Sequence, residues 1–580
     1  MKGLRGIGLA AVLAYAAAIA IRPLNANDLF WHLATGREIL RTGAVPRTDP
    51  FSFTSGGTGW VDHEWLWQSA AAALSSAASK ASAGIPAASS TLALALAGAA
   101  IVLIAFGLGL GRMARDGLPG AAITAFGLLA LETARERLMV RPETASLLML
   151  ALLLTILGAG MPGLRRGLAL GAVAAVWANI HPAVLLAPVV VLLLAAGDLS
   201  DPTRRGGRSL MAAIAIEPAL AAAGTLVNPY GVSLWTVPFH LRGLVRTGTF
   251  FNPEWLPPPM ARFPLIYLCA ALVLAGAAAS GIRRRGVPDG WILVAALLAA
   301  LSLRQMRHMG LFAVALTFAA GPLLRAFDPR GALDSVLARP LPGLLSCAGV
   351  IVATGSVLVS GGGLAQRTGL DPGRFPVEAC EEIAREAPDV RLYNDVRFGG
   401  YLLWRFYPPR KVFIDGRNEV YPQLLARLGA VYAGGPGSYE DWRRLVAEYR
   451  IEGAIVRYQE TLKGVIYPPG HAGEPERRGY RAWSAYLFPP AEWALVYFDD
   501  TALVFMKRGG AGERWIARGE YLALNPEDGD YVRERASSDT AFAARLREDC
   551  ERRLGRAPPS ERAAGICRRA DLPSRPAGGA

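Results

Sequence analysis

The sequence predicts a membrane bundle of about eleven transmembrane helices in residues 1–363, a soluble α/β domain in residues 364–510 and a polar tail in residues 511–580. Hydrophobic residues make up 52% of the 580 residues, and the mean hydropathy of +0.29 is too high for a soluble protein of this length. Runs of Ala, Leu, Val and Ile alternate with short Arg-bearing loops between about residues 85 and 361, whereas Arg, Asp and Glu are dense from residue 365 onward. We therefore expect lipid to surround the first part of the chain and water the second.

The net charge of +14 does not indicate a protein that binds nucleic acid. Many of its arginines lie between hydrophobic segments, where the bias of basic residues toward the cytoplasmic side of a membrane accounts for them. No motif for nucleic-acid recognition accompanies them. The expected partners are membrane lipids and no nucleic acid.

Apolar stretches recur along residues 1–363, and a helix needs about twenty such residues to cross the hydrocarbon layer. The first stretch follows Lys2 and Arg5, as in a signal peptide, but no cleavage site precedes the polar residues from Asn25 to Asp28, which favours a retained first helix. The predicted spans are residues 5–23, 86–110, 118–132, 143–160, 167–181, 183–197, 209–227, 264–281, 289–303, 308–325 and 341–361.

The basic loops set the predicted orientation. With the N-terminus in the cytoplasm, the arginines at 112–115, 165–166, 204–208, 283–285 and 325–339 all face inward. This orientation requires residues 64–83, which are rich in Ala and Ser, to form a helix on the membrane interface instead of a span. It places the loop at 24–85 and the C-terminal domain on the outer face. We expect a multi-pass protein of the cell inner (plasma) membrane with a periplasmic or extracellular C-terminal domain.

The soluble domain alternates strand and helix patterns. Residues 390–394, 411–414 and 453–458 have the pattern of strands, and residues 439–449 that of a helix. Residues 493–498 and 502–507 predict a hairpin that turns at Asp499 and Asp500. The tail from about residue 513 is expected to be helical and partly disordered near its end. The five cysteines contain no CxxC motif, and a disulfide between Cys550 and Cys567 requires an oxidising compartment.

The first outer loop concentrates the residues that could carry chemistry. A carboxylate held near the interface can act as a general base toward a sugar or lipid hydroxyl, and Trp faces stack on sugar rings. Alternatively, the tryptophans form an aromatic belt, and the acids cap helices or pair with Arg37 and Arg47. Residue spacing alone leaves both interpretations open. The candidates in this loop are Asp28, His32, Asp49, Asp62, His63 and Glu64.

The loop resembles the first-loop signature of bacterial membrane proteins grouped with the C-type glycosyltransferase superfamily, in their mannosyltransferase-like members that use dolichyl- or polyprenyl-phosphate sugars. The resemblance covers residues 1 to about 460. It is carried by Asp28, Trp31-His32-Leu33, Gly36, Pro46, Asp49-Pro50-Phe51-Ser52, Trp60 and His63-Glu64-Trp65-Leu66, and later by Arg141-Pro142, Trp177-Ala178-Asn179-Ile180-His181, Asn228-Pro229-Tyr230-Gly231, Glu254-Trp255, Arg304, Arg307-His308, Gly399-Gly400-Tyr401-Leu402 and Phe413-Ile414-Asp415-Gly416-Arg417.

The resemblance implies transfer of a sugar from a lipid-phosphate donor on the outer face, with an acid of the first outer loop as the base. Asp28 is the matching position, and His63 and Glu64 are expected to orient the acceptor or Asp28 itself. The sequence departs from the pattern in having Asn27-Asp28 for an Asp-Glu pair and His181-Pro182 for a frequent His-Gly. The acceptor therefore stays unknown.

Arginines on the same face suit an anionic donor. Arg141, Arg304 and Arg307 are expected to bind its phosphate through bidentate contacts, although binding of lipid headgroups explains them equally well. His181 and His308 lie at span ends, where histidines are more often interfacial than ligands. No metal-binding spacing is present, so no cofactor is firmly expected and a divalent metal stays open.

The predicted function is a membrane glycosyltransferase, of hexosyltransferase type, that moves a sugar from a polyprenyl-phosphate-linked donor to an acceptor of the cell envelope. One alternative is a transporter or flippase for a lipid-linked glycan, which needs polar residues within the spans, where Glu217 and Asn179 are the main ones. Another is a noncatalytic assembly factor of the envelope.

Overall fold

A computed structural model describes residues 2–81, 86–161, 163–199, 212–246, 252–284, 286–371, 373–434, 437–459, 462–467 and 477–569. The chain forms two compact units. Unit 1 contains Met1–Arg47 and Trp60–Leu370, and unit 2 contains Thr48–Gly59 and Asp371–Ala580. The division differs from the predicted boundary at residue 363, and it assigns part of the first outer loop to unit 2.

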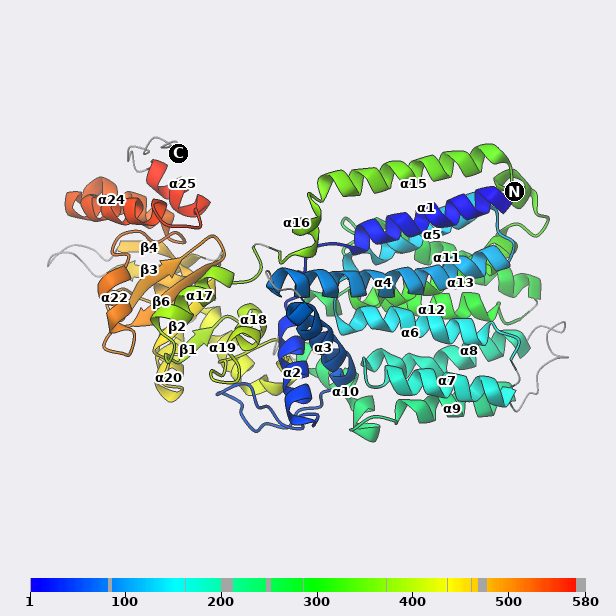
Figure 1. The fold of residues 1–580 in the computed structure, drawn as a ribbon, viewed down its shortest axis with the longest axis horizontal. Helices are drawn as coiled ribbons and strands as arrows, with labels where there is room; N and C mark the ends of the chain where they lie inside the picture. Colours follow the sequence, from blue (N-terminus) through cyan, green and yellow to red (C-terminus); the bar gives the residue numbers. More distant parts are fainter. Residues whose placement is uncertain are drawn as a thin grey trace. The chain divides into compact units, whose positions relative to one another are not determined.

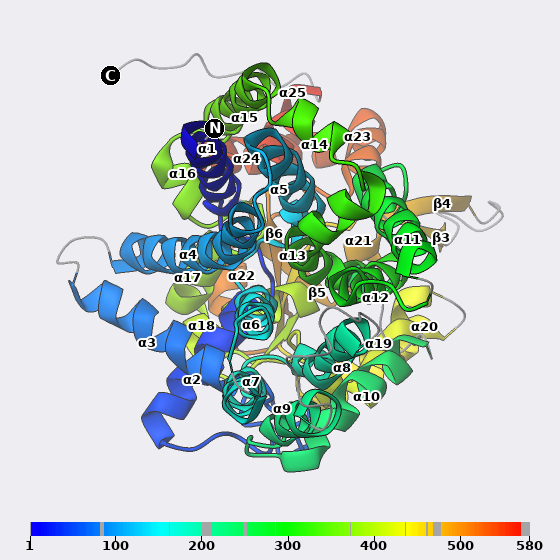
Figure 2. The same cartoon turned by 90° about the vertical axis from the view of Figure 1, so that its right-hand side faces the viewer.

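Unit 1 is a bundle of helices that run alongside one another (Figure 1), and Figure 2 views several of them end-on. A helix is present in each predicted apolar stretch. The bundle helices are α1 (Lys2–Ala20), α4 (Pro86–Arg115), α5 (Gly120–Ala134), α6 (Pro142–Leu157), α7 (Gly163–Trp177), α8 (Leu186–Leu199), α9 (Glu217–Thr225), α11 (Pro264–Arg284), α12 (Gly290–Arg304), α13 (Met309–Phe327) and α15 (Pro340–Ser360). Short helices between them are η1 (Arg135–Arg137), η2 (Pro182–Leu185), η4 (Ala212–Ile216), η5 (Gly231–Thr236), α10 (Val237–Arg246), η6 (Pro253–Trp255), η7 (Met306–His308), α14 (Ala332–Leu337) and α16 (Leu364–Thr368).

Four described helices are long and apolar enough to cross a membrane: Ala88–Arg115, Pro264–Arg284, Met306–Phe327 and Pro340–Ser360. Five further apolar helices are shorter. Together with the bundle architecture, these helices identify a membrane protein. The number of spans stays a prediction, as does the orientation; of the basic clusters that support it, residues 204–208 and Arg285 lie outside the described residues.

Two helices of the first loop, α2 (Leu29–Thr42) and α3 (Trp65–Ala81), lie across the direction of the bundle helices (Figures 1 and 2). Helix α3 falls on the predicted interfacial helix, whereas α2 was not predicted. They cross at Gly36 of α2, where an added Cβ would lie 2.0 Å from the carbonyl oxygen of Gln68 in α3. Only glycine permits this approach, and it brings the polar residues of both helices together.

Unit 2 is built on a mixed four-stranded sheet in the order β1-β2-β6-β5. Strands β1 (Leu392–Asn394) and β2 (Gly453–Arg457) are parallel, and β6 (Ala502–Lys507) is antiparallel to both β2 and β5 (Trp493–Phe498). The predicted hairpin is thus present. The helices are α17 (Val377–Glu386), α18 (Val396–Phe406), η8 (Asn418–Val420), α19 (Pro422–Ala433), α20 (Ser438–Glu448), α21 (Trp483–Leu487), α22 (Glu513–Gly519), α23 (Gly529–Ser538), α24 (Thr540–Leu554) and α25 (Glu561–Arg569).

Three details of unit 2 differ from the sequence predictions or extend them. Residues 411–414 form no strand, because they pair through a single bridge, Val412 with Ser52, in the loop segment Thr48–Gly59. A second sheet of β3 (Leu462–Tyr467) and β4 (Arg477–Ala482) was not predicted. Cys550 in α24 and Cys567 in α25 form a disulfide. The end of the tail, residues 570–580, lies outside the described residues.

Candidate functional site

Asp28 stands at the start of α2 and faces Arg141 at the start of α6. One oxygen of Asp28, Oδ2, lies 3.3 Å from Nη2 of Arg141, and 27% of the Asp28 side chain is exposed. His32 follows one helical turn later on the same face of α2, with its Nε2 4.0 Å from the same oxygen. The first turn of α2 thus presents a carboxylate and an imidazole together.

Glu64 connects this pair to the residues before α3. Its carboxylate lies 3.7 Å from Nε2 of His32 and 3.8 Å from Nε2 of His63. Gln68, in α3, donates a hydrogen bond from Nε2 to Oδ1 of Asp62 at 2.6 Å, and the same nitrogen lies 3.3 Å from Nδ1 of His32. The crossing of α2 and α3 therefore brings Asp28, Glu64 and two histidines into one cluster.

A second acid, Glu254 in η6, lies on the other side of Arg141. Arg141 donates to both of its oxygens, at 2.7 and 3.2 Å, and Arg137 donates to it at 2.8 Å. Arg137 also pairs with Glu143 in the first turn of α6. The backbone N–H of Glu254 is capped by Asn252, which fixes η6 where the carboxylate meets the arginines. The guanidinium groups of Arg137 and Arg141 thus lie among the carboxylates of Asp28, Glu143 and Glu254.

Burial and these charges shift the pKa values in opposite directions. Burial raises the pKa of Asp28, and Glu254 and Glu143 raise it further, while Arg141 opposes them. Burial alone would lower the pKa of Arg141, but the three carboxylates outweigh it and hold the pKa well above the usual value. For Glu254, burial raises the pKa and the two arginines, Arg141 and Arg137, lower it by more. Glu254 is therefore a fixed anion, whereas Asp28 accepts a proton more readily than an ordinary aspartate does.

The histidines of the cluster are neutral at pH 7. Burial lowers the pKa of His63 to about 4, with Arg307 adding to the effect. Burial, followed by the charge of Arg141 and of His63, lowers the pKa of His32 well below its usual value. These neutral rings can donate or accept hydrogen bonds but carry no charge.

The remaining predicted residues are placed differently from one another. Arg307 stacks on Trp255, with its Cζ 4.4 Å from the ring centroid, beside Glu254 in the sequence. His308 is the N-cap residue of α13, and Nδ1 of His181 accepts a hydrogen bond from the backbone N–H of Ala183. Arg304 is exposed at the end of α12, and the described residues give it no hydrogen bond or ion pair with the acids.

Asp49 belongs to unit 2 and not to this cluster. Its carboxylate lies 2.9 Å from Nη2 of Arg417, which also donates to Asp415 at 2.8 and 2.6 Å, and all three side chains are buried. Tyr421 donates to Asp415, and Phe51 packs under the guanidinium at 4.8 Å. Asp49 is thus a structural anion, because it neutralises the buried Arg417.

An apolar cavity of about 160 Å³ has Arg141 among its lining residues. Its walls come from α3, α4 and the start of α6, and Arg141 is its one charged lining residue. The lining residues are Trp67, Ala70, Ala71, Leu74, Leu94, Ala97, Gly98, Ile101, Val140, Arg141 and Thr144. Apolar walls with few polar groups are typical of ligand pockets.

In the described part of the chain, no group of three or more His, Cys, Asp or Glu side chains is arranged to hold a metal ion. The side chains next to Asp28 and Glu254 are guanidinium groups. Metal dependence stays an open prediction.

Arg137 was expected, like Arg141, to suit an anionic donor, and no role was predicted for Glu143 or Glu254. Glu254 forms its ion pair with Arg141, which lies 113 residues away in the sequence, and no local sequence pattern predicts a contact over that separation. The sequence signal was the acid Glu254 beside Trp255, in a loop predicted to lie on the same membrane face as several arginines. This signal predicts that Glu254 forms an ion pair, but it does not say with which arginine.

No protein-family model matches the sequence, and no curated protein matches it. The structure is similar to that of the oligosaccharyltransferase of Archaeoglobus fulgidus in the apo form, with a TM-score of 0.54 and 12% identity over 93% of this chain and 83% of that chain. It is also similar to the archaeal oligosaccharyltransferase AglB of Archaeoglobus fulgidus in complex with an inhibitory peptide and a dolichol-phosphate, with a TM-score of 0.53 and 11% identity over the same shares. These enzymes are membrane glycosyltransferases of the C-type superfamily. At this identity, the likeness shows a shared fold.

Proposed function

We propose that the protein is a membrane glycosyltransferase that moves a sugar from a polyprenyl-phosphate-linked donor to an acceptor on the outer face of a bacterial inner membrane. The observation that carries the proposal is the position of Asp28, a partly exposed carboxylate with a raised pKa, beside Arg141, which lines an apolar cavity. The fold shared with oligosaccharyltransferases supports it, and one of those proteins is described in complex with a dolichol-phosphate.

The proposed reaction is a single displacement at the anomeric carbon. Asp28 removes the proton of an acceptor hydroxyl, the acceptor oxygen forms a bond to the anomeric carbon, and the bond from that carbon to the phosphate oxygen breaks. The electron pair of that bond leaves with the polyprenyl phosphate. Positive charge fixed beside the leaving oxygen stabilises the transition state more than the ground state, because the negative charge grows as the bond breaks.

Arg307 and Arg141 have different parts in this proposal. In the described residues Arg307 has a stacking partner, Trp255, and no ion pair, so its guanidinium is available to the donor phosphate. Arg141 is already engaged by Glu254 and Asp28 and keeps the latter oriented. The hydrocarbon tail would extend along the cavity between α3 and α4, and the neutral rings of His32 and His63 would bind sugar or acceptor hydroxyls.

The test is transfer of radiolabel from a polyprenyl-phosphate sugar pool in membranes that contain the protein. We expect Asp28→Asn to lose orders of magnitude in turnover while it remains inserted in the membrane, because the amide keeps the shape and loses the proton acceptor. The matched control is Asp371→Asn, which removes a half-buried acid outside the cluster that, like Asp28, pairs with an arginine, Arg374. Equal transfer by wild type and Asp28→Asn would reject Asp28 as the base.

For the alternative of a transporter, the main acid expected within the spans is Glu217. It is buried against Arg166, with Oε1 2.5 Å from Nη2, and the first turns of α7 and α9 pack around the pair. A neutralised, packed acid supports a structural role better than a transport path. Label that crosses the bilayer in the same assay without being transferred would favour transport.

A further inference from the structure

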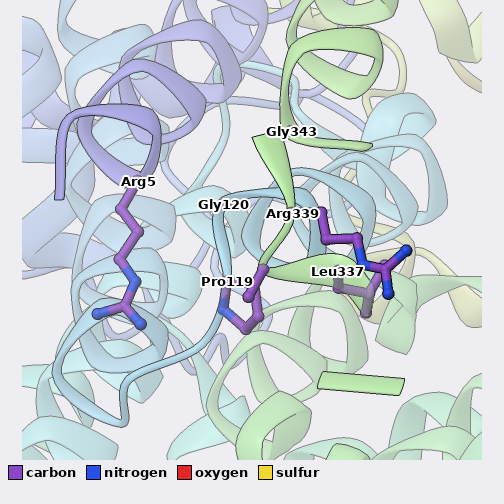
Figure 3. A pocket seen from close by; sticks show the side chains of 7 residues that line it. Arg5, Pro119, Gly120, Leu337, Arg339 and Gly343 are labelled. Atoms are coloured by element: carbon purple, nitrogen blue, oxygen red, sulfur yellow. The ribbon is translucent and has the colours of Figure 1, made fainter. Parts of the chain in front are cut away.

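A second feature of unit 1 lies at the end of the bundle where α1 begins. It is a hollow between the starts of α1, α5 and α15 (Figure 3). Its seven lining residues are Arg5, Pro119, Gly120, Leu337, Ala338, Arg339 and Gly343, none of them acidic. Helix α1 has 19 residues, which corresponds to about 28 Å. Since Asp28 follows the other end of α1, this hollow is separate from the catalytic candidate by the length of a span.

The hollow is positively charged. Figure 3 shows Arg5 and Arg339 on its two sides, with Pro119 between them in this view. Arg5 donates one hydrogen bond, from Nη2 to the carbonyl oxygen of Gly117 at 2.5 Å, and so keeps further donors. Arg339 is exposed, and the described residues give it no ion pair. Helices α5 and α15 also begin here, so the positive ends of two helix dipoles add to the two guanidinium charges.

An apolar groove continues from the hollow. It has a volume of about 180 Å³ and lies between α5, α11, α13 and α14. Leu337 lines both, and Ala121 of the groove follows Gly120 of the hollow in α5. Its lining residues, none of them polar, are Ala121, Ala122, Ala125, Phe126, Leu272, Leu323, Leu324, Phe327, Leu333 and Leu337. The hollow itself has about 20 Å³, which admits a phosphate oxygen but not a sugar ring.

We propose that the hollow and the groove together bind one anionic phospholipid of the leaflet in which α1 begins. Arg5 and Arg339 would bind the phosphate of the headgroup, and one acyl chain would occupy the groove. The combination identifies the ligand, because only an anionic lipid would contact both parts of the site. Free phosphate would leave the apolar groove empty, and a neutral lipid would leave the two arginines, which have no acidic neighbours in the hollow, without a counter-charge. The site is independent of the proposed reaction, because it lies at the opposite end of the span.

The test is native mass spectrometry of the full chain in detergent, titrated with dioleoylphosphatidylglycerol or dioleoylphosphatidylcholine. We expect the wild type to bind one phosphatidylglycerol more tightly than phosphatidylcholine. The double variant Arg5→Gln/Arg339→Gln should bind phosphatidylglycerol about thirtyfold more weakly. The single variant Arg339→Gln, which breaks no hydrogen bond within the described chain, should show part of this loss. Ala125→Phe fills the groove at an exposed position and should weaken binding of phosphatidylglycerol as well.

The matched control is Arg330→Gln, an exposed arginine in the turn before α14 that does not line the hollow. We expect it to bind phosphatidylglycerol as the wild type does. An equal loss in Arg330→Gln and in the double variant would show diffuse surface attraction and overturn the proposal. Unchanged binding in Ala125→Phe would exclude a chain in the groove. Displacement of the lipid by millimolar inorganic phosphate would reassign the hollow to a free anion.

Discussion

Arg141→Gln should raise the pKa of Asp28 and move the acid limb of the transfer reaction to higher pH. The guanidinium lies 3.3 Å from Asp28, and its positive charge opposes the burial that raises that pKa. At an effective dielectric constant of about 20 this pair is worth roughly 5 kcal/mol, and water at the partly exposed carboxylate reduces it to about 2 to 3 kcal/mol, or roughly two pK units. Loss of the bidentate contact also frees Glu254 to repel Asp28.

The assay is the initial rate of sugar transfer in proteoliposomes between pH 4 and pH 9. As the base, Asp28 must be ionised, so the rate falls as the pH drops through its pKa. We expect this fall in Arg141→Gln at a pH about two units above that of the wild type. Arg141→Lys keeps the positive charge but loses the bidentate guanidinium group. Its acid limb should lie at a pH between those of the wild type and Arg141→Gln. An acid limb that stays at the wild-type pH in Arg141→Gln would refute the assignment of Asp28 as the titrating base.

Three further predictions concern stability and topology. His63 has a pKa of about 4 in the folded protein against a usual 6.5. As the pH falls from 6.5 to 4, the unfolded chain binds a proton that the folded protein does not, so the free energy of unfolding should fall by up to about 3 kcal/mol. The melting temperature of His63→Gln should therefore fall less than that of the wild type over this range. Arg417→Gln leaves Asp49 and Asp415 buried without their cation. It should lower the free energy of unfolding of unit 2 by about 3 to 5 kcal/mol, measured by thermal melting and limited proteolysis. Cys550 and Cys567 should react with maleimide in whole cells only after reduction, because an outward-facing unit 2 keeps the disulfide; labelling without reductant would contradict the external location.

The membrane bundle could be predicted because each of its helices is encoded by a continuous apolar stretch. The hairpin of β5 and β6 is likewise local. Helix α2 was not predicted, because it packs on α3 through a close approach at Gly36. A contact of this kind leaves no hydrophobic periodicity in the sequence. Residues 411–414 have the composition of a strand, but their partner is a loop segment that begins at Thr48, so the strand pattern was misleading.

The candidate site was predicted in part. The structure brings Asp28, His32, His63, Glu64 and Arg141 together, as the prediction that they share one membrane face suggested. Their pairing is different from the expectation: Arg141 was predicted to bind phosphate, yet its nearest anions are carboxylates of the protein. Charge type and location are local properties, whereas the partner of each charge is set by packing between distant segments.

The excursion of the first loop into unit 2 has a consequence for the order of folding. The chain leaves unit 1 after Arg47 and returns at Trp60, whose N–H donates to the carbonyl oxygen of Arg47 at 2.9 Å. Within the excursion, Thr54 hydrogen-bonds to Phe413, 359 residues later. At about 5 to 20 residues per second, the ribosome needs roughly 20 to 70 s to supply that partner. The segment between Asp28 and His63 is therefore synthesised early, but a nascent chain that stops before Phe413 cannot give the first loop its final conformation.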